Sequence, residues 1–130
     1  LHITIVILWL TGTAWLGFHY LADSQDIFGF LARSVLLKIH GAAAIVFVFV
    51  IGVIFYHILS GWQKRQQRLS GVTLLSVCGF LILTGWGLYY AGGERLREWI
   101  SAAHSILGFL LPVIIFFHIW NVYKRLKSRK

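Results

Sequence analysis

The chain has 130 residues, of which 58% are hydrophobic and only 12% are charged, and its formal net charge is +8. This composition excludes an ordinary soluble globule and is typical of a polytopic membrane protein. A hydrocarbon core about 30 Å thick needs roughly 20 apolar residues per helix, so four spans with short loops fill the chain. We therefore expect an all-α protein, a transmembrane four-helix up-down bundle forming a single integral-membrane domain over residues 1–130.

The first predicted span covers about residues 3–21, with His2 and His19 near its two ends. It has neither a basic segment before it nor a small-residue cleavage pattern after it. We therefore expect a retained helix and not a signal peptide. The polar residues 22–26 follow, and then an amphipathic stretch that runs to Arg33.

The second predicted span covers about residues 35–59, with His40 near its start and His57 near its end. The small residues Gly41-Ala-Ala-Ala44 follow His40 directly. They permit the close approach either of a neighbouring helix or of a flat ligand, and the sequence favours the two about equally. The connection over residues 61–68 is short, polar and basic.

The third predicted span, about residues 69–91, contains no histidine. Its only cysteine, Cys78, is interpreted as an inert packing residue. Glycines recur along the span and suit tight packing between helices. They are Gly71, Gly79, Gly85 and Gly87.

The fourth predicted span, about residues 98–123, carries His104 near one end and His118 near the other. Their separation of 14 positions places both rings within about 40° of one helix face and roughly 21 Å apart along the axis. An imidazole inside a bilayer is costly unless it is paired or ligating. Pro112 lies between them and predicts a kink, because it removes one donor and leaves the carbonyl of Gly108 without its helical partner.

Lysine and arginine are distributed unevenly between the two predicted sides of the membrane. Eight basic residues and no acid fall on one side: Lys64, Arg65, Arg68, Lys124, Arg125, Lys127, Arg129 and Lys130. The other side combines four basic residues with all four acids: Arg33, Lys38, Arg95, Arg97, Asp23, Asp26, Glu94 and Glu98. The positive-inside rule therefore predicts that both termini are cytoplasmic. The net charge reflects topology and does not indicate nucleic-acid binding.

An up-down path sorts the six histidines into two tiers. The outer tier contains His19, His40 and His104, and the cytoplasmic tier contains His2, His57 and His118. Each tier offers the two imidazoles that bind a low-spin haem iron from opposite sides, with one histidine left over. The spans lack carboxylates and a second cysteine, which disfavours typical zinc and carboxylate-bridged iron sites. Methionine and a Cys-x-x-Cys-His sequence are absent, so we expect two non-covalent b-type haems.

The second and fourth spans run in the same direction and end in similar sequences, which favours pairing their histidines. We predict that His40 pairs with His104 and that His57 pairs with His118. On an ideal helix the rings of His40 and His57 point about 100° apart around the axis. For both to bind haem, a helix tilt, a π-bulge near Gly52 or a different rotation of one haem must compensate for this angle. Otherwise His2 is the partner of His118, and His19 is a weaker reserve in the outer tier.

Basic residues near each tier are candidates for contact with haem propionates, or they are ordinary interface anchors. On the outer side they are Lys38, Arg95 and Arg97, and on the cytoplasmic side they are Lys64, Arg65 and Lys124.

Over nearly its whole length the chain resembles the small four-helix bis-histidine b-type cytochromes of bacterial membranes, such as the cytochrome b subunits of hydrogenases and formate dehydrogenases. The resemblance rests on four features: Lys38-Ile-His40-Gly41-Ala, Phe55-Tyr-His57-Ile with Gly61-Trp62, Leu83-Thr-Gly85 with Leu88-Tyr89-Tyr90, and His104 with His118. The step from His40 to His57 is longer than the usual spacing in that family. In the hydrogenase and formate dehydrogenase types, a histidine of the first helix supplies the second ligand of the inner haem, the one on the cytoplasmic side. His2 therefore stays a candidate.

The resemblance implies electron transfer across a bacterial inner membrane between a quinone pool and a redox partner at the outer face. We expect no catalytic site in the chain itself, because almost no mass lies outside the spans. The chemistry then belongs to a partner, a c-type cytochrome or a metalloenzyme subunit of a respiratory complex. The alternatives are a histidine-lined carrier or channel for protons or metal ions, and a membrane anchor with one haem or none.

Overall fold

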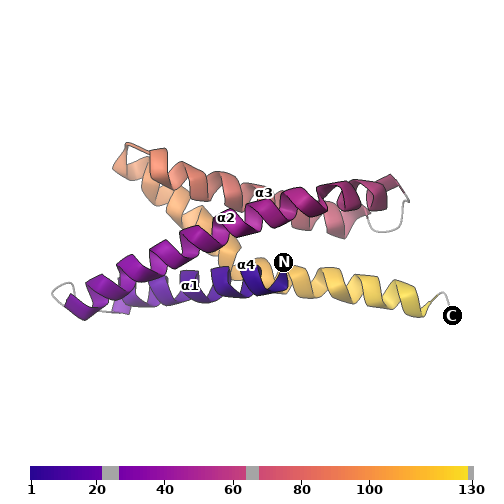
Figure 1. Ribbon diagram of the computed structural model, residues 1–130, viewed down its shortest axis with the longest axis horizontal. Coiled ribbons are helices and arrows are strands. Elements are labelled where there is room, and N and C mark those ends of the chain that lie inside the picture. Colours follow the sequence, from indigo (N-terminus) through magenta and orange to yellow (C-terminus); the bar gives the residue numbers. More distant parts are fainter. Residues whose placement is uncertain (22–26, 64–67, 129–130) are drawn as a thin grey trace. The chain divides into compact units, whose positions relative to one another are not determined.

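The computed structural model describes the backbone of residues 1–21, 27–63 and 68–128, and their side chains except those of 56–63, 68 and 125–126. This part of the chain is all-helical, as predicted (Figure 1). The helices are α1 (His2–Leu21), α2 (Ile27–Gln63), α3 (Arg68–Tyr90) and α4 (Glu94–Lys127). All four are long and apolar enough to cross a membrane.

Large apolar side chains occupy most sides of these helices instead of a single stripe. Many of these side chains are not covered by other parts of the chain; the exposed fraction is, for example, 74% for Ile45, 70% for Phe49 and 67% for Leu83. Such surfaces are unfavourable in water and suit contact with lipid tails, where a helix satisfies its own backbone hydrogen bonds. The fold is therefore compatible with a multi-pass membrane protein.

Two helices extend beyond the predicted spans. The amphipathic stretch that runs to Arg33 is part of α2, which begins at Ile27 and not near residue 35. Helix α4 begins at Glu94, whose carboxylate suits the positive end of the helix dipole, and not near residue 98. Helix α2 is regular α-helix throughout, so the π-bulge considered near Gly52 is absent.

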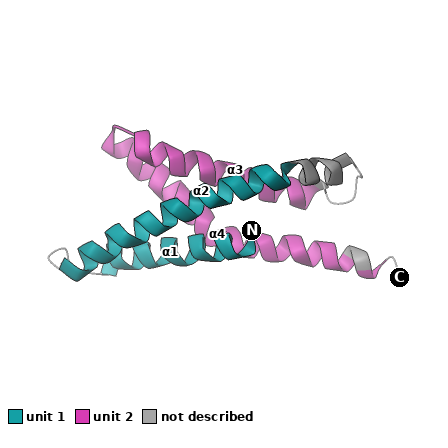
Figure 2. Cartoon of the chain, in the orientation of Figure 1, with its two compact units in different colours: residues 1–55 teal, residues 56–130 magenta. Residues whose placement is uncertain are grey.

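The chain divides into two compact units, residues 1–55 and residues 56–130 (Figure 2). In the first unit, α1 and α2 form an antiparallel hairpin. Thr11 contacts His40, whereas Phe18, further along α1, contacts Phe28, which lies earlier in α2. The ring centroids of the two phenylalanines are 6.2 Å apart in an edge-to-face arrangement.

The second unit is an antiparallel hairpin of α3 and α4 with a constant register. Ser70 contacts His118 and Thr84 contacts His104, and the residue numbers of each pair add to the same value, 188. The buried residues Cys78 and Leu111 lie between these contacts. Burial of Cys78 agrees with its predicted role as a packing residue.

Pro112 lies inside α4, which continues through it as one helix. Figure 1 shows α4 changing direction along its length. A straight helix projects as a straight line from any viewpoint, so the bend belongs to the helix. Proline is a common cause of such bends, because it lacks the backbone donor of one helical hydrogen bond and its ring crowds the preceding turn.

Candidate functional site

His40 lies half-buried on α2, against the neighbouring helix of its own hairpin. Its Nδ1 is 3.0 Å from Oγ1 of Thr11 on α1, and the ring also forms a hydrogen bond with the backbone of Leu8. A Cβ atom added to Gly12 would lie 3.3 Å from Cε1 of the same ring. The Nδ1–Cε1 edge of His40 therefore lies against the Thr11-Gly12 step of α1.

His104 on α4 has the same surroundings in the other hairpin. Its Nδ1 is 2.9 Å from Oγ1 of Thr84 on α3. A Cβ on Gly85 would lie 3.3 Å from its Cε1 and 3.8 Å from its Nδ1. In both hairpins, a Thr-Gly step on the first helix supports a histidine on the second.

His118 has a looser version of this arrangement. Its Nδ1 is 3.2 Å from Oγ of Ser70, and a Cβ on Gly71 would lie 3.9 Å from its Cε1. The step from Ser70 to Thr84 on α3 equals the step from His104 to His118 on α4, as the antiparallel register requires. We refer to Thr11–His40, Thr84–His104 and Ser70–His118 as the histidine–hydroxyl pairs.

The two reserve histidines have different surroundings. The His19 ring is exposed and stacks on Trp15 of its own helix, with ring centroids 4.8 Å apart. His2 is exposed and lies nine positions before Thr11, on the opposite side of an ideal α1. Within the described residues, neither ring has a hydrogen bond to another helix.

The predicted ligand pairs, His40 with His104 and His57 with His118, stay predictions. The first would join residues 1–55 to residues 56–130. The second depends on the side chain of His57, which lies in α2 but outside the described side chains.

The chemistry of the described histidines can be compared with what each kind of metal site needs. In the described part of the chain, no three or more His, Cys, Asp or Glu residues gather into a group that could hold a metal ion. Zinc and non-haem iron sites need such groups, because the protein supplies most of their ligands. A haem iron takes only its axial ligands from the protein, so single imidazoles from separate helices are sufficient.

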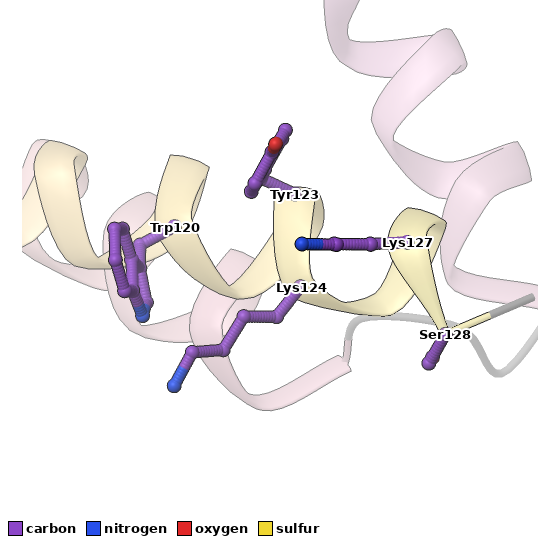
Figure 3. A pocket seen from close by; sticks show the side chains of 5 residues that line it. All are labelled: Trp120, Tyr123, Lys124, Lys127 and Ser128. Atoms are coloured by element: carbon purple, nitrogen blue, oxygen red, sulfur yellow. The ribbon is translucent and has the colours of Figure 1, made fainter.

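One candidate propionate partner is engaged elsewhere. Nζ of Lys124 lies 5.3 Å from the ring centroid of Trp120, a cation–π distance. Both residues line an open hollow on α4 together with Tyr123, Lys127 and Ser128, and Figure 3 shows these five side chains. Aromatic and basic residues at a helix end are typical of a membrane–water interface, so Lys124 fits the anchor interpretation. Lys38, Arg95 and Arg97 are exposed, and the side chains of Lys64 and Arg65 lie outside those described.

The hydroxyl partners of the histidines were not predicted from the sequence. The signal was a repeated tripeptide, because Leu10-Thr11-Gly12 and Leu83-Thr84-Gly85 match. The related step Ser70-Gly71 precedes the second copy by 14 positions. That interval equals the spacing of the two histidines on the next helix. A search for small-hydroxyl-plus-glycine steps at the histidine interval would have found the pairs in the second hairpin.

Comparisons of the chain with protein-family models, with curated proteins and with solved structures find no match.

Proposed function

We propose that this chain is a di-haem b-type cytochrome that relays electrons across the bacterial inner membrane as a subunit of a larger complex. The observation that carries the proposal is the set of three histidine–hydroxyl pairs. A histidine that ligates a metal almost always binds the metal through one ring nitrogen and forms a hydrogen bond through the other nitrogen to a neighbouring group that does not touch the metal. Three of the four predicted ligands, His40, His104 and His118, have such a hydrogen-bonding neighbour, a side-chain hydroxyl, at Nδ1.

Two sites follow from this assignment. His40 and His104 would hold the outer haem, and His57 and His118 would hold the inner one. A haem held by two imidazoles supplies a one-electron carrier. His104 and His118 are separated along α4 by about 21 Å of helical rise, which is a large part of a hydrocarbon core about 30 Å thick. The two sites would therefore carry electrons between the leaflets.

The proposed partners follow from the family resemblance. At the outer face we propose a c-type cytochrome or a metalloenzyme as the redox partner. The resemblance supports a quinone as the partner at the other end of the path. The chain itself would bind and orient the two carriers in the lipid phase and have no catalytic site of its own.

A pyridine haemochrome assay on the purified full chain tests the proposal. We expect about two b-type haems per chain and the reduced absorption bands of a b-type cytochrome. One haem or none, in protein whose circular dichroism shows intact helices, would contradict the di-haem assignment and support a membrane anchor. Metal-dependent flux through haem-free liposomes would instead support the histidine-lined carrier.

A further inference from the structure

We propose that Thr11 and Thr84 are positioning residues that select the tautomer of the facing histidine. Each threonine hydroxyl accepts a hydrogen bond from Nδ1–H, so the lone pair of the neutral imidazole lies on Nε2. The consequence for iron ligation rests on the proposed function. The tautomer itself is a property of the chain and can be measured without haem.

The hydroxyl group of Thr84 has a single proton to donate. Oγ1 lies 2.8 Å from the carbonyl oxygen of Phe80, one turn earlier, and 3.2 Å from that of Leu81. A carbonyl only accepts, so the hydroxyl must donate in this direction. Its proton is then not available to Nδ1 of His104, which lies 2.9 Å away. Both short contacts are satisfied only if Nδ1 carries a proton and donates it to Oγ1.

Thr11 repeats the arrangement in the other hairpin. Its Oγ1 lies 2.7 Å from the carbonyl oxygen of Ile7 and 3.2 Å from that of Leu8. Nδ1 of His40 lies 3.0 Å from the same hydroxyl oxygen. The ring also forms a hydrogen bond with the backbone of Leu8, whose carbonyl can only accept and therefore also takes a ring N–H. The assignment is therefore the same for both histidines predicted to share the outer haem, and both would present Nε2 as the basic nitrogen.

This assignment gives the hydroxyls a specific role in ligation. An acceptor at Nδ1–H fixes the ring orientation and makes Nε2 a stronger electron-donating ligand. A stronger ligand stabilises the ferric state of the iron over the ferrous state. Removing the acceptor should therefore raise the reduction potential of the haem and leave the orientation of the imidazole ring less fixed. A threonine that merely packed between helices would change stability without moving either property.

Helix α3 provides a matched set of variants. Thr84→Val keeps the shape of the side chain and removes the acceptor, whereas Thr84→Ser restores it. Thr73→Val is the control, because Thr73 is exposed on the same helix and its hydroxyl likewise bonds a carbonyl one turn earlier, that of Leu69, at 2.9 Å. The control loses the same intrahelical bond but no bond to a histidine.

Nitrogen NMR of ¹⁵N-histidine-labelled, haem-free full chain in lipid reports the tautomer directly. We expect His104 to show a protonated Nδ1 and a lone-pair Nε2 in the unmodified chain, in Thr84→Ser and in Thr73→Val. In Thr84→Val we expect the share of the Nδ1-protonated tautomer to fall. The assignment would be overturned if Nδ1 of His104 carried the lone pair in the unmodified chain, or if the tautomer of His104 were unchanged in Thr84→Val. Either result counts whether or not the protein binds haem.

Redox titration of the haem-loaded chain tests the consequence for ligation. In Thr84→Val we expect one of the two midpoint potentials to rise, and we expect neither to move in Thr73→Val. The serine variant should return to the unmodified value. Unchanged potentials in a protein that binds two haems would contradict the positioning role, whereas failure to bind haem would contradict the proposed function and leave the NMR result to decide the tautomer.

Discussion

Replacing His104 with alanine is expected to remove one of two haems from the chain, and replacing His118 is expected to remove the other. Each substitution deletes one of the proposed axial imidazoles and, with it, the partner of Thr84 or Ser70 on the neighbouring helix. A low-spin haem of this kind needs both axial ligands to stay bound without a covalent link. We therefore expect each variant to keep about half of the haem, and the double variant to keep little.

Haem per protein and redox titration measure this outcome. His19→Ala is the matched control, because that ring is exposed and stacks on Trp15 of its own helix. It should keep both haems with unchanged potentials. If His104→Ala and His118→Ala each keep both haems, the two-site account is wrong and the membrane anchor is supported.

The identity of the second inner ligand can be decided in the same assay. We expect His57→Ala to lose the inner haem and His2→Ala to keep it. His2 is exposed and lies on the side of α1 opposite Thr11, the residue that faces α2. The reverse result would assign the inner site to His2 and would make the 17-position interval between His40 and His57 irrelevant to ligation.

Much of the fold could be predicted from the sequence because a membrane-length apolar run has few other structures open to it. Four such runs predict four helices. Their ends were less predictable, since bilayer thickness limits the apolar run and not the helix. Helix α2 thus begins at Ile27 and includes Arg33, because nothing in this segment interrupts a helix.

The candidate site was predictable only in part. The 14-position step between His104 and His118 places both on one face of a helix, and both do contact α3. Their hydroxyl partners lie 20 and 48 positions away in sequence, so no local periodicity reveals them. The glycines of α3 were assigned to helix packing as a group, yet Gly85 lies against the ring of His104 and Gly79 has no neighbour within 4 Å of an added Cβ.

These different surroundings predict a graded response to alanine along α3. Gly85→Ala should displace His104, because the new methyl group would lie 3.3 Å from Cε1 and the ring must move to admit it. Overpacking of this kind typically costs about 1–3 kcal/mol. Gly71→Ala should be tolerated, since its methyl would lie 3.9 Å from the ring of His118. Gly79→Ala should be neutral or stabilise the helix by about 0.5–1 kcal/mol.

Haem content and midpoint potentials, measured for each variant, separate a local effect on the ligand from a general loss of stability. Gly85→Ala should lose or shift one haem and leave the other, whereas equal damage from Gly79→Ala would contradict the argument. Gly12→Ala extends the test to the first hairpin, because its methyl would also lie 3.3 Å from Cε1 of His40. If His40 and His104 bind one iron, Gly12→Ala and Gly85→Ala must affect the same haem, and effects on two different haems would refute that pairing.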